Sequence, residues 1–162
     1  MSLQMVCLGW HWVPYRYVKT DDSGRPVAEF PEWLRELARD AVSDALGAES
    51  FPGYEPDAAL VNYYGEDAKL GMHQDKDEKS LAPVVSLSLG ESCIFRFGNA
   101  ETRNRPYTDI ELQSGDLFVF GGPARLAYHG VTRVMPGTGP PDIGIDAGRL
   151  NITIRETGLQ AA

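Results

Sequence analysis

The chain has 162 residues, of which 43% are apolar, with a net charge of −8 and an isoelectric point near 4.8. This composition excludes a disordered or collagen-like chain, and the length suits one domain with a substantial core. The acidic balance argues against a non-specific nucleic-acid-binding protein, because phosphate contact favours basic surfaces. The two cysteines form no paired framework, and no signal-peptide pattern or long apolar run is present, so we expect a reduced, cytoplasmic setting.

One helix is predicted over residues 31–47, PEWLRELARDAVSDALG. Pro31 suits a first helical position, and Gly47 suits the end of a helix. Apolar residues recur between them at helical spacing, which predicts that the helix covers one face of a sheet. These residues are Trp33, Leu34, Leu37, Ala41, Val42, Ala45 and Leu46.

Most of the chain after this helix is predicted to be β-structure. Short runs rich in β-branched and aromatic residues alternate with Gly, Pro, Asn and Asp, which is typical of a sandwich or jelly roll. QSGD at 113–116 predicts a tight turn, and the Pro- and Gly-rich segment 135–148 predicts a long loop of a kind that is often functional. The predicted strands lie within residues 58–65, 83–90, 93–98, 107–112, 116–122, 125–131 and 149–156.

The last predicted strand, RLNITIR at 149–155, alternates strictly between an apolar and a polar face. The simpler interpretation is an exposed polar face over a buried apolar one. The alternative is that the polar face lines a pocket, where two arginines could bind an anion with two carboxylates. Asn62 and Tyr64 share a face in a similar alternation. The polar residues of the last strand are Arg149, Asn151, Thr153 and Arg155.

Two of the histidines suggest a metal site. In GMHQDKDE at 71–78, His73 and Asp75 are separated by one residue, so both would project to the same side of a strand or open turn. His129 follows much later, at the end of another predicted strand. Two imidazoles and one carboxylate form the facial triad of non-haem Fe(II) oxygenases, which leaves positions for a co-substrate and O₂.

Each part of this hypothesis has a simpler explanation. His-x-Asp tripeptides are common, a histidine after an aromatic strand is more often packed or exposed than ligating, and DKDEK at 75–79 is typical of a solvated loop. One function nevertheless accounts for the motif, the second histidine and the Arg/Asn/Arg strand in this order. A structural zinc site usually has four ligands and often cysteine, whereas only three candidates exist here, which favours an open catalytic site.

Together, these segments resemble the AlkB family of Fe(II)- and 2-oxoglutarate-dependent dioxygenases. The resemblance extends over about residues 8–155, and HQDKDE and RxNxTxR are its most specific parts. It implies a mainly β protein, a double-stranded β-helix (jelly roll) with one or two covering helices and an N-terminal nucleotide-recognition lid. We expect a single domain over 1–162, with the lid at about 8–30 and the jelly-roll core at about 58–157. The segments that carry the resemblance are LVNYYGEDAKLGMHQDKDE, PVVSLSLG, IFRFG, GDLFVFGG, RLAYHGV and RLNITIR.

The resemblance implies a set of metal and co-substrate residues. His73, Asp75 and His129 would bind Fe(II). Arg149, with Tyr64 and Asn151, would hold the distal carboxylate of 2-oxoglutarate. Arg155, with Asn62, would contact the carboxylate beside the keto group.

The resemblance also implies substrate contacts. Asp77 matches a position that touches the substrate base, where a carboxylate would favour cationic lesions over unmodified bases. Arg103 matches a substrate-side arginine. LGWHWVPYRY at 8–17 resembles the nucleotide lid, in a form two residues shorter than that of the family. Within it, the base- and backbone-contacting aromatics and their neighbours would be Trp10, Tyr15, Arg16 and Tyr17.

The implied activity is oxidative demethylation of N-alkylated bases, such as 1-methyladenine and 3-methylcytosine, in alkylated single- or double-stranded DNA, with RNA left open. 2-Oxoglutarate would be decarboxylated with O₂ and formaldehyde released, as in DNA alkylation repair. The basic segments 15–19 and 95–105 could contact phosphates despite the acidic balance. We expect a monomer with no membrane partner. Two alternatives stay open: the same iron chemistry on a protein or small molecule, and a non-catalytic β-sandwich with structural Zn²⁺.

Overall fold

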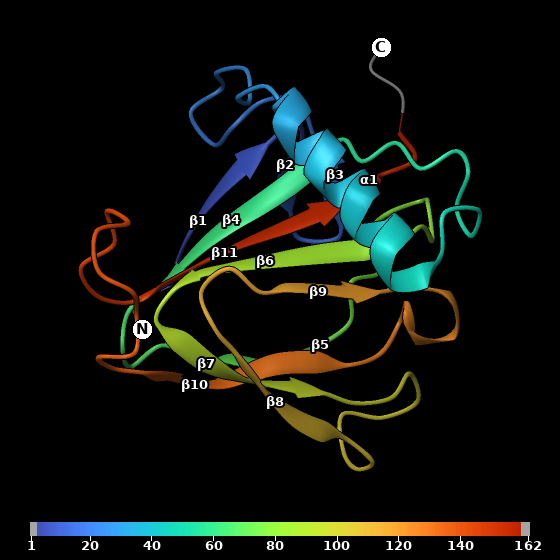
Figure 1. Cartoon of the computed structure of the whole chain (residues 1–162). Coiled ribbons are helices and arrows are strands. Elements are labelled where there is room, and N and C mark those ends of the chain that lie inside the picture. Colours follow the sequence, from blue (N-terminus) through green and yellow to red (C-terminus); the bar gives the residue numbers. More distant parts are fainter. Residues whose placement is uncertain (1–2, 160–162) are drawn as a thin grey trace.

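The computed structural model describes residues 3–159, which form two large antiparallel sheets, a two-stranded hairpin and one helix on the outside (Figure 1). The larger sheet has the order β1-β4-β11-β6-β9, and the smaller has the order β5-β10-β7-β8. This is the predicted jelly roll. The strands are β1 (Leu3–Leu8), β2 (His11–Val13), β3 (Arg16–Val18), β4 (Ala58–Tyr64), β5 (Leu70–His73), β6 (Val84–Gly90), β7 (Ser92–Phe97), β8 (Thr108–Leu112), β9 (Leu117–Phe120), β10 (His129–Met135) and β11 (Arg149–Arg155).

The predicted helix is present as α1 (Glu32–Leu46) and lies across the outer face of the larger sheet (Figure 1). Pro31 is the N-cap rather than the first helical residue, and Gly47 ends the helix at φ +100°. Trp33, 58% exposed, and Ala45 do not belong to the buried face, because the stripe runs instead through Ala38. The buried residues of α1 are Leu34, Ala38, Ala41 and Val42.

β11 lies in the middle of the larger sheet, between β4 and β6. Its apolar residues Ile152 and Ile154 pack with α1 on the outer face. Its polar residues are also buried, on the inner face that looks toward the smaller sheet, and they line a cavity between the sheets. The structure therefore rejects the exposed polar face and confirms the pocket-lining alternative.

The smaller sheet differs from the prediction near its metal-site end. The predicted strand over 125–131 begins only at His129, because a 3-10 helix (Gly122–Ala124) and a turn occupy the preceding residues. β5 was not predicted, since LGMH is short and lacks β-branched residues. β5 and β10 pair so that His73 and His129 are opposite each other. The fold thus brings together two histidines that are far apart in the sequence.

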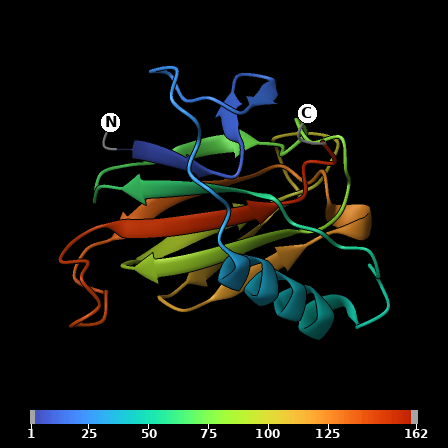
Figure 2. The same ribbon diagram turned by 90° about the horizontal axis from the view of Figure 1, so that it is seen from above.

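The predicted lid region contains the β2–β3 hairpin, which lies beyond the edge of the larger sheet (Figure 2). Tyr17 of β3 is buried with Cys7, Ala58 and Leu60, so the hairpin is anchored to the sheet by its own side chains. Its function as a lid stays a prediction. The predicted single domain over 1–162 includes residues 1–2 and 160–162, which lie outside the described residues. None of the described helices is long and apolar enough to cross a membrane.

Candidate metal centre and co-substrate pocket

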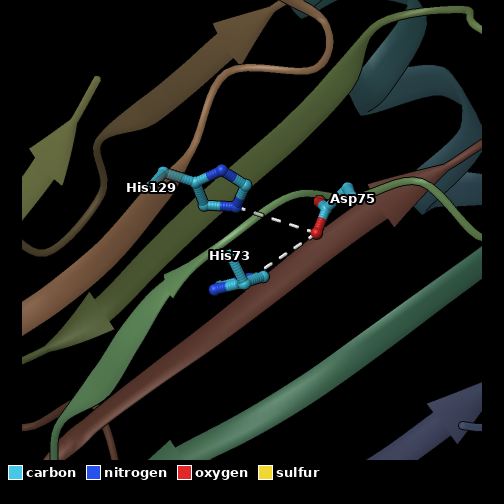
Figure 3. A group of neighbouring side chains, drawn as sticks. All are labelled: His73, Asp75 and His129. Carbon is cyan, nitrogen blue, oxygen red and sulfur yellow. Dashed lines mark ion pairs between the residues drawn. The ribbon is translucent and has the colours of Figure 1, made fainter. Parts of the chain in front are cut away.

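The side chains of His73, Asp75 and His129 converge (Figure 3), and the two histidines line the cavity. His73 ends β5, Asp75 follows it in an irregular segment, and His129 begins β10. Nε2 of His73 lies 3.6 Å from Asp75 Oδ1, and Nε2 of His129 lies 3.7 Å from the same oxygen. One potential ligand atom from each residue lies within 4.8 Å of the others, so the three residues could hold a metal ion.

Both imidazoles are oriented by main-chain carbonyls. Nδ1 of His73 lies 2.9 Å from the Gly71 carbonyl, and Nδ1 of His129 lies 2.9 Å from the Ala127 carbonyl. Because a carbonyl only accepts, each Nδ1 carries a proton, and in the neutral ring it is Nε2, on the side of Asp75, that keeps the lone pair. Burial lowers the pKa of His129, which favours the neutral form that a metal requires.

Asp75 is a buried carboxylate held in its ionised form. Burial acts to raise its pKa, but nearby positive charge, that of Arg155 foremost, outweighs this effect, and the pKa lies below its ordinary value. Arg155 Nη2 lies 3.0 Å from Asp75 Oδ2, as an ion pair without hydrogen-bond alignment. The site therefore offers two imidazoles and one negative carboxylate, the donor set of a facial triad.

The cavity beside this triad contains a buried cation with no counterion. Arg149 is 1% exposed, and its Nη2 donates to Ser88 Oγ at 2.9 Å. Its Nε and Nη1 atoms have no hydrogen-bond partner, and no carboxylate among residues 3–159 forms an ion pair with it. A buried unpaired charge is costly, so this guanidinium fits an anionic ligand.

The predicted co-substrate residues all line this cavity together with the two histidines. Asn62 and Tyr64 come from β4, and the other three come from β11. A dicarboxylate between Arg149 and the triad would contact the polar side chains of both β4 and β11. The residues present therefore fit Fe(II) and 2-oxoglutarate. The predicted metal and co-substrate residues among those that line the cavity are Asn62, Tyr64, His73, His129, Arg149, Asn151 and Arg155.

The structure does not place Trp10 where a base could stack on it. The side chain is 8% exposed, its indole donates to Asp57 at 3.1 Å, and Lys19 Nζ lies 3.9 Å from the ring centroid. Trp12, which the sequence interpretation passed over, donates instead to Asp77 Oδ2 at 2.8 Å. The strand period does not relate the two residues, because Trp12 lies within β2 whereas Trp10 precedes the strand. The aromatic residue beside Asp77 is therefore Trp12.

The remaining predicted substrate residues fall into two groups. Tyr15, 82% exposed at the hairpin turn, and Arg16 face solvent. Arg103 is also exposed, donates to the Met72 carbonyl at 3.1 Å and lies 5.1 Å from the Tyr128 ring, so it lies close to the metal-site end of β5. Tyr17 is buried, and its hydroxyl bonds to Glu78 and Arg155. Tyr17 is therefore shielded from solvent and contacts Arg155, which lines the cavity.

A buried ion pair behind the triad was also missed. Arg125 Nη2 and Glu78 Oε1 lie 2.7 Å apart, and both side chains are almost fully buried. Glu78 lies in the acidic run that the sequence suggests is solvated, and Arg125 lies in the predicted strand that is in fact a turn. The sequence offered one signal for this ion pair: each residue lies in a segment that also contains a predicted metal ligand.

The family model of the 2OG-Fe(II) oxygenase superfamily matches residues 1–155. The dioxygenase AlkB of Escherichia coli is 41% identical over 155 residues, which cover 93% of this chain and 68% of that protein. The DNA N(6)-methyladenine demethylase ALKBH1D of Arabidopsis thaliana is 35% identical, over 96% of this chain and 40% of that protein. The solved structure of OsALKBH1 superimposes with a TM-score of 0.86 at 38% identity, over 96% of this chain and 79% of that one.

Proposed function

Because this chain belongs to the AlkB family of the 2OG-Fe(II) oxygenase superfamily, we propose that it demethylates N-alkylated bases of nucleic acids oxidatively. Enzymes of this superfamily use Fe(II), 2-oxoglutarate and O₂. When bound, the metal and the keto acid supply the oxidising chemistry, and the protein supplies binding, orientation and exclusion of water. The observation that carries the proposal is the convergence of His73, Asp75 and His129 beside a buried cation without a counterion.

The three converging side chains would hold Fe(II). Each imidazole points its Nε2 atom toward Asp75, and nearby positive charge favours the ionised form of Asp75, so the three ligand atoms already face one another. The carbonyls of Gly71 and Ala127 act as orienting acceptors for the rings, a common arrangement around metal-bound histidines.

The arginines of β11 would hold the two ends of 2-oxoglutarate. Arg149, with Tyr64 and Asn151, faces the part of the cavity that lacks negative charge and would bind the distal carboxylate. Arg155, with Asn62, would contact the carboxylate beside the keto group, next to Asp75. The co-substrate would thus be fixed with its keto end toward the metal.

The substrate base would lie beside Asp77. A carboxylate there favours 1-methyladenine and 3-methylcytosine, which are cationic at neutral pH, and its advantage grows as water is excluded. Such a base must leave its stack, and the indole of Trp12, bonded to Asp77, offers a replacement surface. Arg103 at the metal-site end and Arg105 beside Tyr107 would contact phosphates.

The direct test is to incubate the protein with Fe(II), 2-oxoglutarate, ascorbate and oligonucleotides that carry 1-methyladenine, 3-methylcytosine or N6-methyladenine. We expect the cationic lesions to lose the mass of one CH₂ group, with succinate formed in equal amount. His129→Ala serves as the control that should abolish both products. Conversion of 2-oxoglutarate to succinate with no change in any oligonucleotide would favour a protein or small-molecule substrate instead. Absence of both products in the unaltered protein would contradict the oxygenase itself.

A second test separates the two tryptophans. Trp12→Phe should lower turnover of methylated oligonucleotide and leave succinate formation without substrate unchanged. Trp10→Phe should change turnover much less, because that ring is buried and carries the Lys19 ammonium group over it. A larger loss of turnover in Trp10→Phe than in Trp12→Phe would contradict the assignment of Trp12 as the residue beside the base.

A further inference from the structure

A chain of buried polar side chains connects the β2–β3 hairpin to the metal and co-substrate residues. The Tyr17 hydroxyl donates to Glu78 Oε2 at 2.5 Å and accepts from Arg155 Nη1 at 3.1 Å. These directions are fixed, because a carboxylate only accepts and a guanidinium only donates. Burial raises the pKa of Tyr17, so the hydroxyl keeps its proton. Tyr17 therefore joins Glu78 to Arg155, which itself pairs with Asp75.

Arg125 fixes the other side of the same network. Its guanidinium donates to the main-chain carbonyl of Asp75 at 2.6 Å, to the carbonyl of Ala82 at 2.8 Å and to Glu78 at 2.7 Å. Residues 75–82 form no regular strand, so these bonds take the place of a ladder in holding the segment. The position of the Asp75 main chain thus depends on a side chain that is not a ligand.

The charges within this network balance one another. Its two carboxylates, Asp75 and Glu78, balance its two guanidinium groups, Arg125 and Arg155, and all four side chains are buried. Hydrogen bonds to charged groups are the strong ones in a protein interior, and removing one partner leaves another buried group unpaired. Every member of this set is therefore positioned by the others.

We infer that Tyr17 is a positioning residue for 2-oxoglutarate, through Arg155 and Glu78, and not a nucleic-acid contact as the sequence resemblance implies. The hydroxyl gives Arg155 an acceptor that holds its guanidinium toward the cavity, while the rest of Tyr17 belongs to the hairpin core. This inference rests on the proposed function, since it concerns the residue proposed to bind the co-substrate.

The test is Tyr17→Phe, which removes one oxygen and keeps the ring, with Tyr15→Phe as the exposed control from the same hairpin. Binding of 2-oxoglutarate is titrated without O₂, from the visible absorbance of the Fe(II) complex, so that no turnover is needed. We expect the Kd for 2-oxoglutarate to rise about tenfold in Tyr17→Phe and to be unchanged in Tyr15→Phe. At saturating 2-oxoglutarate, the KM for methylated oligonucleotide should equal that of the unaltered protein.

Glu78→Asp provides a second variant in case Tyr17→Phe does not fold. It keeps the negative charge that Arg125 needs and withdraws the carboxylate from Tyr17, so the Kd should rise in the same direction. An unchanged Kd in folded Tyr17→Phe, with a raised KM for oligonucleotide, would overturn the inference and return Tyr17 to the substrate contacts. Failure of the unaltered protein to bind 2-oxoglutarate would instead contradict the proposed function, so the two outcomes are distinguishable.

Discussion

The two ends of β11 carry the same residue type in opposite electrostatic surroundings. Arg155 lies in a closed set of charges, paired with Asp75 and bonded to Tyr17. Arg149 lies equally deep, but among residues 3–159 it has a serine hydroxyl as its hydrogen-bond partner and no carboxylate. At the first end the charges balance within the protein, although Arg155 Nε has no hydrogen-bond partner among the described residues, whereas at the second end the positive charge is balanced only by an added anion. The position of a buried charge therefore says less about its role than the identity of its partners.

The largest expected effect is on stability at the Arg155 end. Glu78→Gln removes a buried negative charge and leaves Arg125 without its ion-pair partner, so the free energy of unfolding should fall by about 3–5 kcal/mol. Urea denaturation of the metal-free protein measures this change. Glu36→Gln, on the exposed face of α1, is the matched control and should change it little. Equal stability in both variants would show that Arg125 does not depend on Glu78 to balance its charge.

The second expected effect is on ligand affinity at the Arg149 end. Arg149→Met should raise the Kd for 2-oxoglutarate about 100-fold, which corresponds to about 2.7 kcal/mol, because the distal carboxylate loses its cation. Stability without ligand should stay equal or increase, since an apolar side chain replaces an unpaired buried charge. Calorimetric titration and urea denaturation measure the two quantities, with the exposed Arg133→Met as control. A loss of stability as large as that in Glu78→Gln would remove the contrast between the two ends.

The same contrast explains how much of the fold the sequence could predict. RLNITIR alternates with the two-residue period of a strand, and residues 31–47 repeat with the period of a helix. Each pattern fits one kind of element, and the structure confirms the strand and the helix. β5 and the hairpin strands were missed because three or four residues are too few to establish a period. Trp33 was assigned to the wrong face because one position along a helix turns a side chain by about 100°.

The site was predictable where residue type alone determines the chemistry. His73, Asp75 and His129 are the ligand types that iron requires, and their convergence follows from the pairing of β5 with β10. Glu78 was missed because the residues after β5 follow no strand period, and Trp12 because β2 has only three residues, so the direction of each side chain depends on partners distant in sequence. A neighbouring pair such as Asp77 and Glu78 can therefore have one residue bonded to an indole and the other buried beside an arginine.

The smallest expected effect concerns the hydroxyl that orients Arg149. Ser88 is fully buried, and its Oγ accepts from Arg149 Nη2 at 2.9 Å. Without this oxygen the guanidinium keeps its charge but loses its fixed orientation, so Ser88→Ala should weaken 2-oxoglutarate binding about fivefold, or about 1 kcal/mol.

Two titrations show where that loss arises. 2-Oxobutanoate, a keto acid without a distal carboxylate, does not reach Arg149, so its affinity should be the same in Ser88→Ala and in the unaltered protein. Ser92→Ala, a buried serine of β7 that does not line the cavity, should leave both affinities unchanged. If the affinity for both keto acids fell equally in Ser88→Ala, the serine would support the whole pocket. The two ends of β11 would then not act separately, because a change at the Arg149 end would also alter binding at the keto-acid end.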